Sequence, residues 1–236
     1  MWVSKIKVKQ IDWGWFPKEI ASVVEFGGCP LRCPGFGAST PIEGVTSCIN
    51  YSSVLPQYQS EWKSMTPSHL HSIVDSGPPL IALSGGEPLF QAAAELTEFV
   101  RLLGPTRPIV LWTSLSMAVP AWVVDKNRYL LIDVKLPSSG EYGATILSSL
   151  KSLDMLRVCL SFTIVRLRDL GDIEKSLGQI YLQNRKGSPY QKIVLVLLDD
   201  QYLEAAFKWA SSRPERIQIV TSELYPSLRE FPRIDG

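Results

Sequence analysis

The sequence of 236 residues lacks several features, and each absence excludes a class of protein. Its 24 Lys and Arg nearly balance 23 Asp and Glu, whereas a nucleic-acid-binding surface needs a basic excess or stripe. No run of about 18 apolar residues is present, so we predict no membrane span. The N-terminus lacks the apolar core of a signal peptide, which indicates a cytoplasmic protein. With 45% hydrophobic and 20% charged residues, the composition is that of a folded globular domain.

Histidine and cysteine are also scarce, and their positions restrict the possible metal sites. His69 and His71 are two residues apart in a predicted helix, so they point to different faces and receive no role. Cys159 lies in an apolar stretch and is interpreted as a small buried hydrophobe. The other three cysteines fall within 20 residues: Cys29, Cys33 and Cys48. In a reducing compartment, such clustering indicates metal binding or catalysis.

Apolar runs alternate with amphipathic stretches along most of the chain. The predicted strands are 21–26, 80–83, 109–112, 129–134, 158–165, 192–197 and 216–220. The predicted helices begin at Thr66-Pro67 or span 92–103, 144–153, 173–182 and 204–211. Alternating strands and helices imply right-handed βαβ units and a parallel sheet, and about six to seven units are too few for a closed barrel.

We therefore predict an α/β fold, a partial, open parallel βα barrel of about six to seven units. The whole chain, 1–236, is predicted to form one domain with an N-terminal extension over 1–20. Folds of this kind place their sites at the carboxyl ends of the strands. Residues 34–65 show little periodicity, and we interpret this long loop as functional.

Two cysteines directly follow the first predicted strand, in Cys29-Pro-Leu-Arg-Cys33, and Cys48 follows after fourteen intervening residues. Three thiolates are the minimum set for a [4Fe–4S] cluster with one open iron, which can bind a substrate or cofactor. A structural zinc site needs four Cys or His ligands, so zinc held with one of the histidines is the alternative.

A second motif, Ser84-Gly85-Gly86-Glu87-Pro88, follows the second predicted strand. The two glycines let the backbone turn sharply and approach a ligand closely. Backbone carbonyls and a carboxylate there could hold an ammonium group. Taken alone, the motif fits an ordinary strand-to-helix turn equally well. Its occurrence together with the cysteine loop favours a binding site.

The cysteine loop and the Gly-Gly-Glu-Pro turn together resemble the radical S-adenosylmethionine (radical SAM) superfamily, from about residue 25 to about residue 220. The resemblance implies that the three cysteines hold a [4Fe–4S] cluster whose open iron binds S-adenosylmethionine, and that the turn holds its amino group. Reductive cleavage then gives a 5'-deoxyadenosyl radical that abstracts hydrogen. The resemblance implies further cofactor-binding residues at Thr113, Ser114, Asp133 and Lys135, with less weight on Ser161, Thr163 and Arg166. No catalytic residue is assigned.

The chain departs from the family spacing, C-x3-C-x2-C, which would place the third cysteine at the position of Phe36. Either the cluster site is lost, or the loop carries an insert over 34–47 and Cys48 is the third ligand. We prefer the insert, because Cys48-Ile-Asn resembles the step after the third cysteine in activating enzymes and the segment is rich in Gly, Ser and Thr. The alternative is a catalytically degenerate binding protein that keeps the fold without the cluster.

Two subfamilies fit parts of the sequence. Glycyl-radical-enzyme activases, especially the anaerobic ribonucleotide reductase type, resemble it at Gly14-Trp15, at the cysteine loop and at Asp133-Val-Lys135. The enzyme 7-carboxy-7-deazaguanine synthase resembles it at 133–140, Asp-Val-Lys-Leu-Pro-Ser-Ser-Gly, but the Gln-Gly-Glu-Gly and Cys-Asp-Thr segments of that family are absent. We favour the activase-like interpretation, which implies a glycyl-radical protein and an electron donor as partners.

Overall fold

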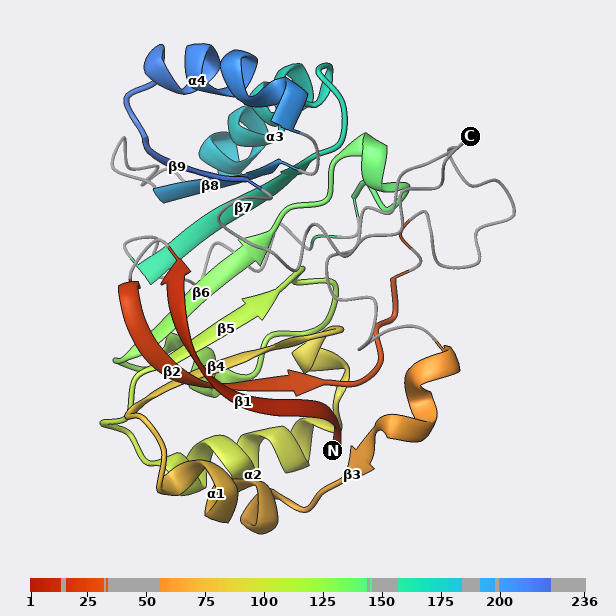
Figure 1. Cartoon of the computed structure of the whole chain (residues 1–236), viewed down its shortest axis with the longest axis vertical. Helices are drawn as coiled ribbons and strands as arrows, with labels where there is room; N and C mark the ends of the chain where they lie inside the picture. Colours follow the sequence, from red (N-terminus) through yellow and green to blue (C-terminus); the bar gives the residue numbers. More distant parts are fainter. Residues whose placement is uncertain are drawn as a thin grey trace.

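The computed structural model describes residues 1–13, 16–31, 33, 56–143, 145, 157–183, 192–197 and 200–221. Its centre is one nine-stranded sheet in the order β3-β1-β2-β4-β5-β6-β7-β8-β9 (Figure 1). The strands are β1 (Trp2–Trp13), β2 (Phe16–Phe26), β3 (Lys63–Ser64), β4 (Leu80–Gly85), β5 (Ile109–Thr113), β6 (Arg128–Asp133), β7 (Val158–Ile164), β8 (Lys192–Leu197) and β9 (Arg216–Val220).

Strands β2 and β4 to β9 run parallel, whereas β1 pairs antiparallel with both β2 and β3. Because the strand order ends at β3 and β9, the sheet is open over the described residues. The α/β fold with an open, mostly parallel βα barrel is therefore confirmed. The parallel strands read as apolar runs because both of their faces are covered, and nearly every residue of β4, β7 and β8 is buried.

Among the described residues, four α-helices and several short 3-10 helices connect the strands. They are α1 (Pro67–Asp75), α2 (Ala93–Leu103), α3 (Asp169–Gln183) and α4 (Leu203–Ser211), with η2 (Pro56–Glu61), η3 (Pro88–Phe90), η4 (Ala121–Val124), η5 (Pro137–Ser139) and η8 (Asp200–Tyr202). Thr66 caps α1 as predicted, since its hydroxyl accepts a hydrogen bond from the amide of His69. The helix predicted over 144–153 lies outside the described residues, apart from residue 145. None of the described helices is long and apolar enough to cross a membrane.

Strand β1 lies within residues 1–20, for which the sequence analysis predicts an N-terminal extension and no strand. The run Lys5-Ile-Lys-Val-Lys9 alternates with period two, which is typical of a strand with one polar face, and it could have revealed β1. The strand predicted at 21–26 is the second half of β2, and only this half pairs with β4.

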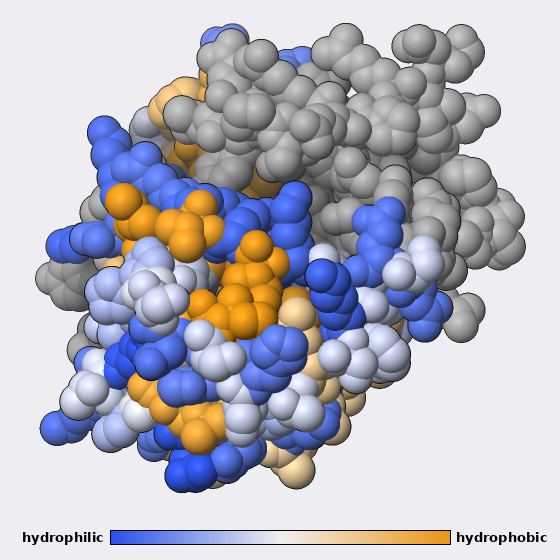
Figure 2. All heavy atoms as spheres, turned by 60° about the horizontal axis from the view of Figure 1, so that its bottom comes forward, coloured by the Kyte–Doolittle hydropathy of each residue, from blue (hydrophilic) through white to orange (hydrophobic). Residues whose placement is uncertain are grey.

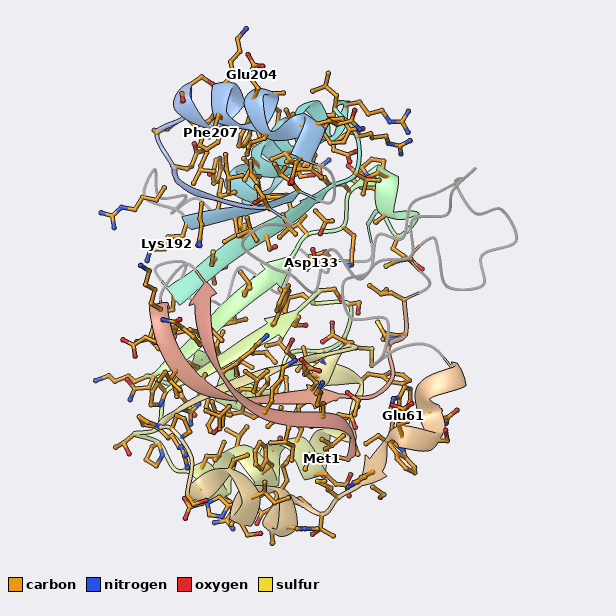
Figure 3. The ribbon with its side chains drawn as sticks, viewed as in Figure 1. Met1, Glu61, Asp133, Lys192, Glu204 and Phe207 are labelled. Carbon is orange, nitrogen blue, oxygen red and sulfur yellow. The ribbon has the colours of Figure 1, made fainter. Side chains whose placement is uncertain are left out.

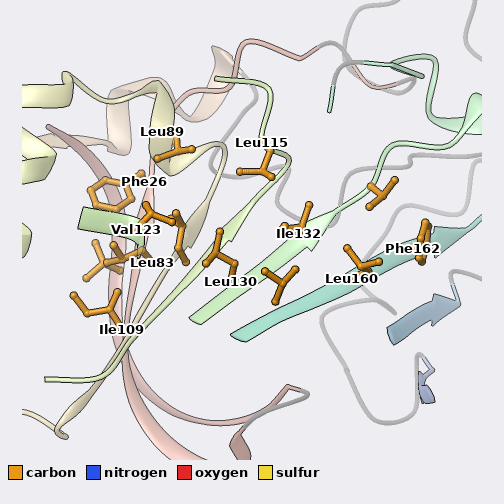
Figure 4. Close-up of a cluster of buried hydrophobic side chains, with 14 of the residues drawn as sticks. Phe26, Leu83, Leu89, Ile109, Leu115, Val123, Leu130, Ile132, Leu160 and Phe162 are labelled. Carbon is orange, nitrogen blue, oxygen red and sulfur yellow. The ribbon is translucent and has the colours of Figure 1, made fainter. Parts of the chain in front are cut away.

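The sheet has two distinct faces. One packs against the helices through the main core, part of which is shown in Figure 4, where Phe26, Leu83 and Ile132 point to the same side. The opposite face, called the inner face here, carries a second buried apolar cluster: Ile11, Ala21, Val23, Leu80, Ala82, Val110, Leu131, Cys159, Val194, Val196 and Val220. Near the carboxyl ends of the strands the inner face becomes polar, because Glu25 lies opposite Ser84 and Asp133 lies opposite Ser161. The fold thus gathers polar groups at the edge where the cysteine loop begins.

Candidate active site

The cysteine loop and the Gly-Gly-Glu-Pro turn lie together at the carboxyl ends of β2 and β4. The amide of Gly86 donates to the carbonyl of Phe26 at 2.9 Å, and the amide of Glu87 donates to the carbonyl of Gly28 at 2.9 Å. These two backbone hydrogen bonds bind the turn to the segment that leads directly into Cys29. The two motifs that carried the sequence-based prediction are therefore neighbours in space.

Gly85 makes this close approach possible. Its φ is +103°, which residues with a side chain rarely adopt, and a Cβ there would lie 2.4 Å from both the amide nitrogen and the carbonyl oxygen of Phe26. The contact is with backbone, so a side chain could be accommodated only by moving β2 or β4.

The Glu87 carboxylate is buried and accepts four hydrogen bonds from the protein. Its Oε1 accepts from the Thr113 hydroxyl at 2.7 Å and from the Leu89 amide at 3.1 Å. Its Oε2 accepts from the amide of Ser114 at 2.8 Å and from its hydroxyl at 2.6 Å. Glu87 therefore joins the turn after β4 to the end of β5, and it brings together the predicted residues Thr113 and Ser114. This arrangement supports a positioning role for the carboxylate and leaves direct ligand contacts to the backbone of the turn.

Gln91 also fixes the segment that leads into Cys29, and the sequence analysis did not predict a role for it. Its buried side chain accepts from the amide of Trp2 at 2.8 Å and donates to the carbonyl of Gly27 at 2.9 Å. A single glutamine shortly after a proline carries no recognisable signal in the sequence.

Pro88 begins η3 as a first-turn residue, and Ser84 lies buried in β4.

The two described thiols share one electrostatic environment. Burial raises the pKa of Cys29 to about 12, and it also raises the pKa of Cys33. The Lys135 ammonium opposes burial at both sites by lowering each pKa, and a charge on Cys33 raises the pKa of Cys29. Lys135 thus stabilises the thiolate form, which is the form that binds a metal.

These thiols fit part of the predicted cluster site. Soft thiolate donors on a loop next to a cation are suited to iron–sulfur ligation. Within the described ranges there is no group of three or more His, Cys, Asp or Glu that could hold a metal ion. Cys48, the third predicted ligand, and Phe36 lie outside those ranges.

Asp133 and Lys135 form an ion pair of 2.5 Å after β6. They line a small hollow on the protein surface, together with Val134, Leu136, Ser138, Ser139, Thr163 and Val165. Ser138 lines this hollow, and its buried hydroxyl has no hydrogen-bond partner within the described part of the chain. Ser138 belongs to the segment 133–140 that resembles 7-carboxy-7-deazaguanine synthase, and the structure adds it to the candidate residues.

The remaining predicted residues separate into two groups. Thr163 lines the hollow and Ser161 is buried on the inner face, whereas Arg166 pairs with Asp169 at 3.6 Å. Figure 3 shows Asp133 near the middle of the sheet, well separated from Lys192 and Phe207. His71 contacts Asp75 at 3.6 Å on α1, and Cys159 is buried in β7 as predicted.

The raised pKa of Cys29 leads to a testable alkylation pattern. At pH 8 we expect iodoacetamide to modify Cys29 in the metal-free protein roughly a hundred- to a thousandfold more slowly than an ordinary cysteine, because only the thiolate reacts. The rate should continue to rise with pH above 10, where the rate of an ordinary thiol has levelled off. Peptide mass spectrometry measures each cysteine separately, and the urea-unfolded chain is the control. Equal rates for Cys29 in the folded and unfolded chains would contradict the assignment.

No family model matches the sequence, and no curated protein sequence matches it. The structure is similar to the crystal structure of QueE from Escherichia coli, with a TM-score of 0.65 and 15% sequence identity over 92% of each chain. QueE is a 7-carboxy-7-deazaguanine synthase and a radical SAM enzyme. At this identity the likeness establishes the fold: the chain has the open βα barrel architecture of QueE.

Proposed function

We propose that this protein is a radical SAM enzyme. The observation that carries the proposal is the meeting of three elements at one edge of the sheet. The thiols of Cys29 and Cys33 follow β2, the turn held by Glu87 follows β4, and the Asp133–Lys135 pair follows β6. The fold shared with QueE supports the same conclusion.

Cys29, Cys33 and Cys48 are proposed to hold a [4Fe–4S] cluster. When bound, the cluster supplies the electron that cleaves S-adenosylmethionine to a 5'-deoxyadenosyl radical for hydrogen abstraction. The chain's own residues bind and orient the reactants. Gly85 and Gly86 present backbone groups, Glu87 fixes the turn, and the hollow beside Lys135 offers hydroxyl and charged groups.

Two finer assignments have separate support. A reaction like that of 7-carboxy-7-deazaguanine synthase is favoured by the similarity to QueE and by the segment 133–140 that lines the hollow. Activation of a glycyl-radical partner protein is favoured by the sequence around the cysteine loop, and the comparison with QueE does not add to it. Formation of 7-carboxy-7-deazaguanine by the cluster-containing enzyme would support the synthase assignment. A glycyl-radical EPR signal on a partner protein would support the activase assignment.

Anaerobic reconstitution with iron and sulfide tests the common proposal. We expect about four irons per chain and a reduced EPR spectrum that changes when S-adenosylmethionine is added, because one iron is open. No retained iron, or a spectrum indifferent to S-adenosylmethionine, would favour a degenerate binding protein.

The ligand set is tested with two variants of the same loop. Cys48→Ala should abolish the cluster signal, and Phe36→Ala should leave it intact. A full signal in Cys48→Ala would show that the third ligand lies elsewhere. Cys159→Ala is a further control, since this thiol is buried in β7 and should not contribute to iron binding.

A further inference from the structure

Gly27 and Gly28 directly precede Cys29, and glycine has more conformational freedom to lose on folding than any other residue. The packing around both positions excludes a larger residue. A Cβ at Gly27 would lie 2.5 Å from the indole of Trp62, and a Cβ at Gly28 would lie 3.1 Å from the ring of Phe90. The segment therefore has no side chains of its own to restrict it, and its conformation depends on hydrogen bonds from its neighbours.

Three successive backbone carbonyls before the cysteine loop each accept a hydrogen bond. The first and the third, those of Phe26 and Gly28, accept from backbone amides of the Gly-Gly-Glu-Pro turn. The middle carbonyl, that of Gly27, accepts from Nε2 of Gln91 at 2.9 Å. Of these three donors, only that of Gln91 belongs to a side chain, so a substitution can remove it without changing the backbone of the turn.

The same side chain connects the segment to β1. Oε1 of Gln91 accepts from the amide of Trp2 at 2.8 Å, and the carbonyl of Trp2 accepts from the amide of Gly27 at 2.9 Å. The three residues thus form a closed ring of hydrogen bonds. Because Gln91 is only 7% exposed, losing its amide group would leave a donor and an acceptor without partners in a region poor in water.

Gln91 is itself held in place by η3. Its amide donates to the carbonyl of Pro88 at 3.2 Å, which closes the short turn. Glu87 lies at the beginning of the same turn, and its amide binds the carbonyl of Gly28. One short turn therefore holds both glycines, with Glu87 on Gly28 and Gln91 on Gly27.

Apolar cover alone does not fix this segment. Phe90 is 48% exposed, so water reaches the ring that lies next to Gly28. Seen from the end that carries α1 and α2, apolar side chains on the surface form separate groups divided by polar ones (Figure 2). The hydrogen bonds of the ring are therefore the stronger restraint on the glycines.

We propose that Gln91 is a positioning residue for the cluster, which acts through Gly27 to fix the place of the Cys29 sulfur. This inference rests on the proposed function, in which Cys29 is a cluster ligand. Without the amide group of Gln91, the two glycines are free to adopt other conformations, and the sulfur spreads over several positions. Outer contacts of this kind orient metal ligands, and their loss typically lowers metal affinity or activity about 10- to 100-fold.

The variant Gln91→Met tests the proposal, because it keeps the length of the side chain and removes both hydrogen bonds. In the metal-free protein we expect the amides of Trp2 and Gly27 to exchange hydrogen at least about tenfold faster. The amide of Ile81, which donates to the carbonyl of Pro108 at the other end of β4, should exchange at the parent rate. In the reconstituted protein we expect a chelator to remove iron about 10 to 100 times faster, and the EPR spectrum of the reduced cluster to broaden.

Two further variants separate the causes. At pH 8 the ionised carboxylate of Gln91→Glu can accept from the amide of Trp2 but cannot donate to Gly27. We expect faster iron loss in this variant with continued protection of the Trp2 amide. Gln10→Met is the matched control, because the Gln10 side chain also donates to a backbone carbonyl, that of Lys18, at 2.9 Å. It should retain iron as the parent protein does.

Iron loss at the parent rate in both Gln91 variants would overturn the proposal, even with a lower urea midpoint, since Gln91 would then only stabilise the fold. That result requires a parent protein that holds a cluster, and it is a failure of this inference alone. A parent protein that holds no cluster would overturn the proposed function, and the role of Gln91 toward the cluster with it.

Discussion

Replacing Glu87 by alanine is expected to destabilise the metal-free protein by about 3 kcal/mol or more. The substitution leaves the buried amide of Ser114 and the hydroxyl of Thr113 without their acceptor, in a region that water does not reach. It also opens a gap between the ends of β4 and β5. Urea denaturation measures the effect as a lower midpoint with an unchanged slope.

Two further variants separate the hydrogen bonds from the volume. Glu87→Gln keeps the shape but replaces one acceptor oxygen by an amide group, so its effect should fall between the parent and Glu87→Ala. Glu98→Ala removes an exposed carboxylate that pairs with Arg101 on α2, and it should leave the midpoint unchanged. A midpoint for Glu87→Ala as high as that of Glu98→Ala would refute the positioning role.

Replacing Gly85 by alanine is expected to cost about 3 to 5 kcal/mol, a large part of the total stability of a typical domain. The new Cβ would meet the backbone of Phe26 at 2.4 Å, and the positive φ adds strain. Since the two strands must separate, the hydrogen bonds that join the turn to the cysteine loop should weaken as well. We therefore expect a lower melting temperature and faster hydrogen exchange at the amides of Gly86 and Glu87.

Gly178 provides the matched control on α3. A Cβ there meets no atom within 4 Å, and its φ lies in the ordinary range. Because alanine is the better helix former, Gly178→Ala should stabilise the protein by about 0.5 to 1 kcal/mol. If Gly178→Ala lowered stability as Gly85→Ala does, the loss of stability in Gly85→Ala could not be attributed to the contact between its new Cβ and Phe26.

The strands could be predicted because strands buried on both faces are locally rich in apolar residues. Apolar runs such as Leu80–Leu83 and Lys192–Leu197 carry their own signal, and the open parallel arrangement follows from their alternation with helices. Strand β1 was not predicted, because its apolar residues alternate with lysines and form no continuous apolar run.

The site was predictable in its residue types but not in its contacts. The motifs identified Glu87, Thr113 and Ser114 separately, yet no local pattern shows that the carboxylate accepts hydrogen bonds from both of the others. Gln91 and Ser138 depend on partners or cavities formed by residues distant in sequence, so they leave no signal along the chain. The third cluster ligand, Cys48, remains a prediction.

The long strand β1 has a consequence for the behaviour of the protein at high concentration. It pairs with β3 only at Trp2 and Val3, so most of its other edge has no partner strand among the described residues. An open edge invites another chain to add a strand, which is a common start of aggregation. Lys5, Lys7 and Lys9 repeat along this strand, and two copies brought together in register would place like charges side by side. The lysines thus favour a protein that stays dispersed. Exchanging the exposed Lys5 for threonine should lower its solubility while leaving intact the ion pair between Lys7 of β1 and Glu25 of β2.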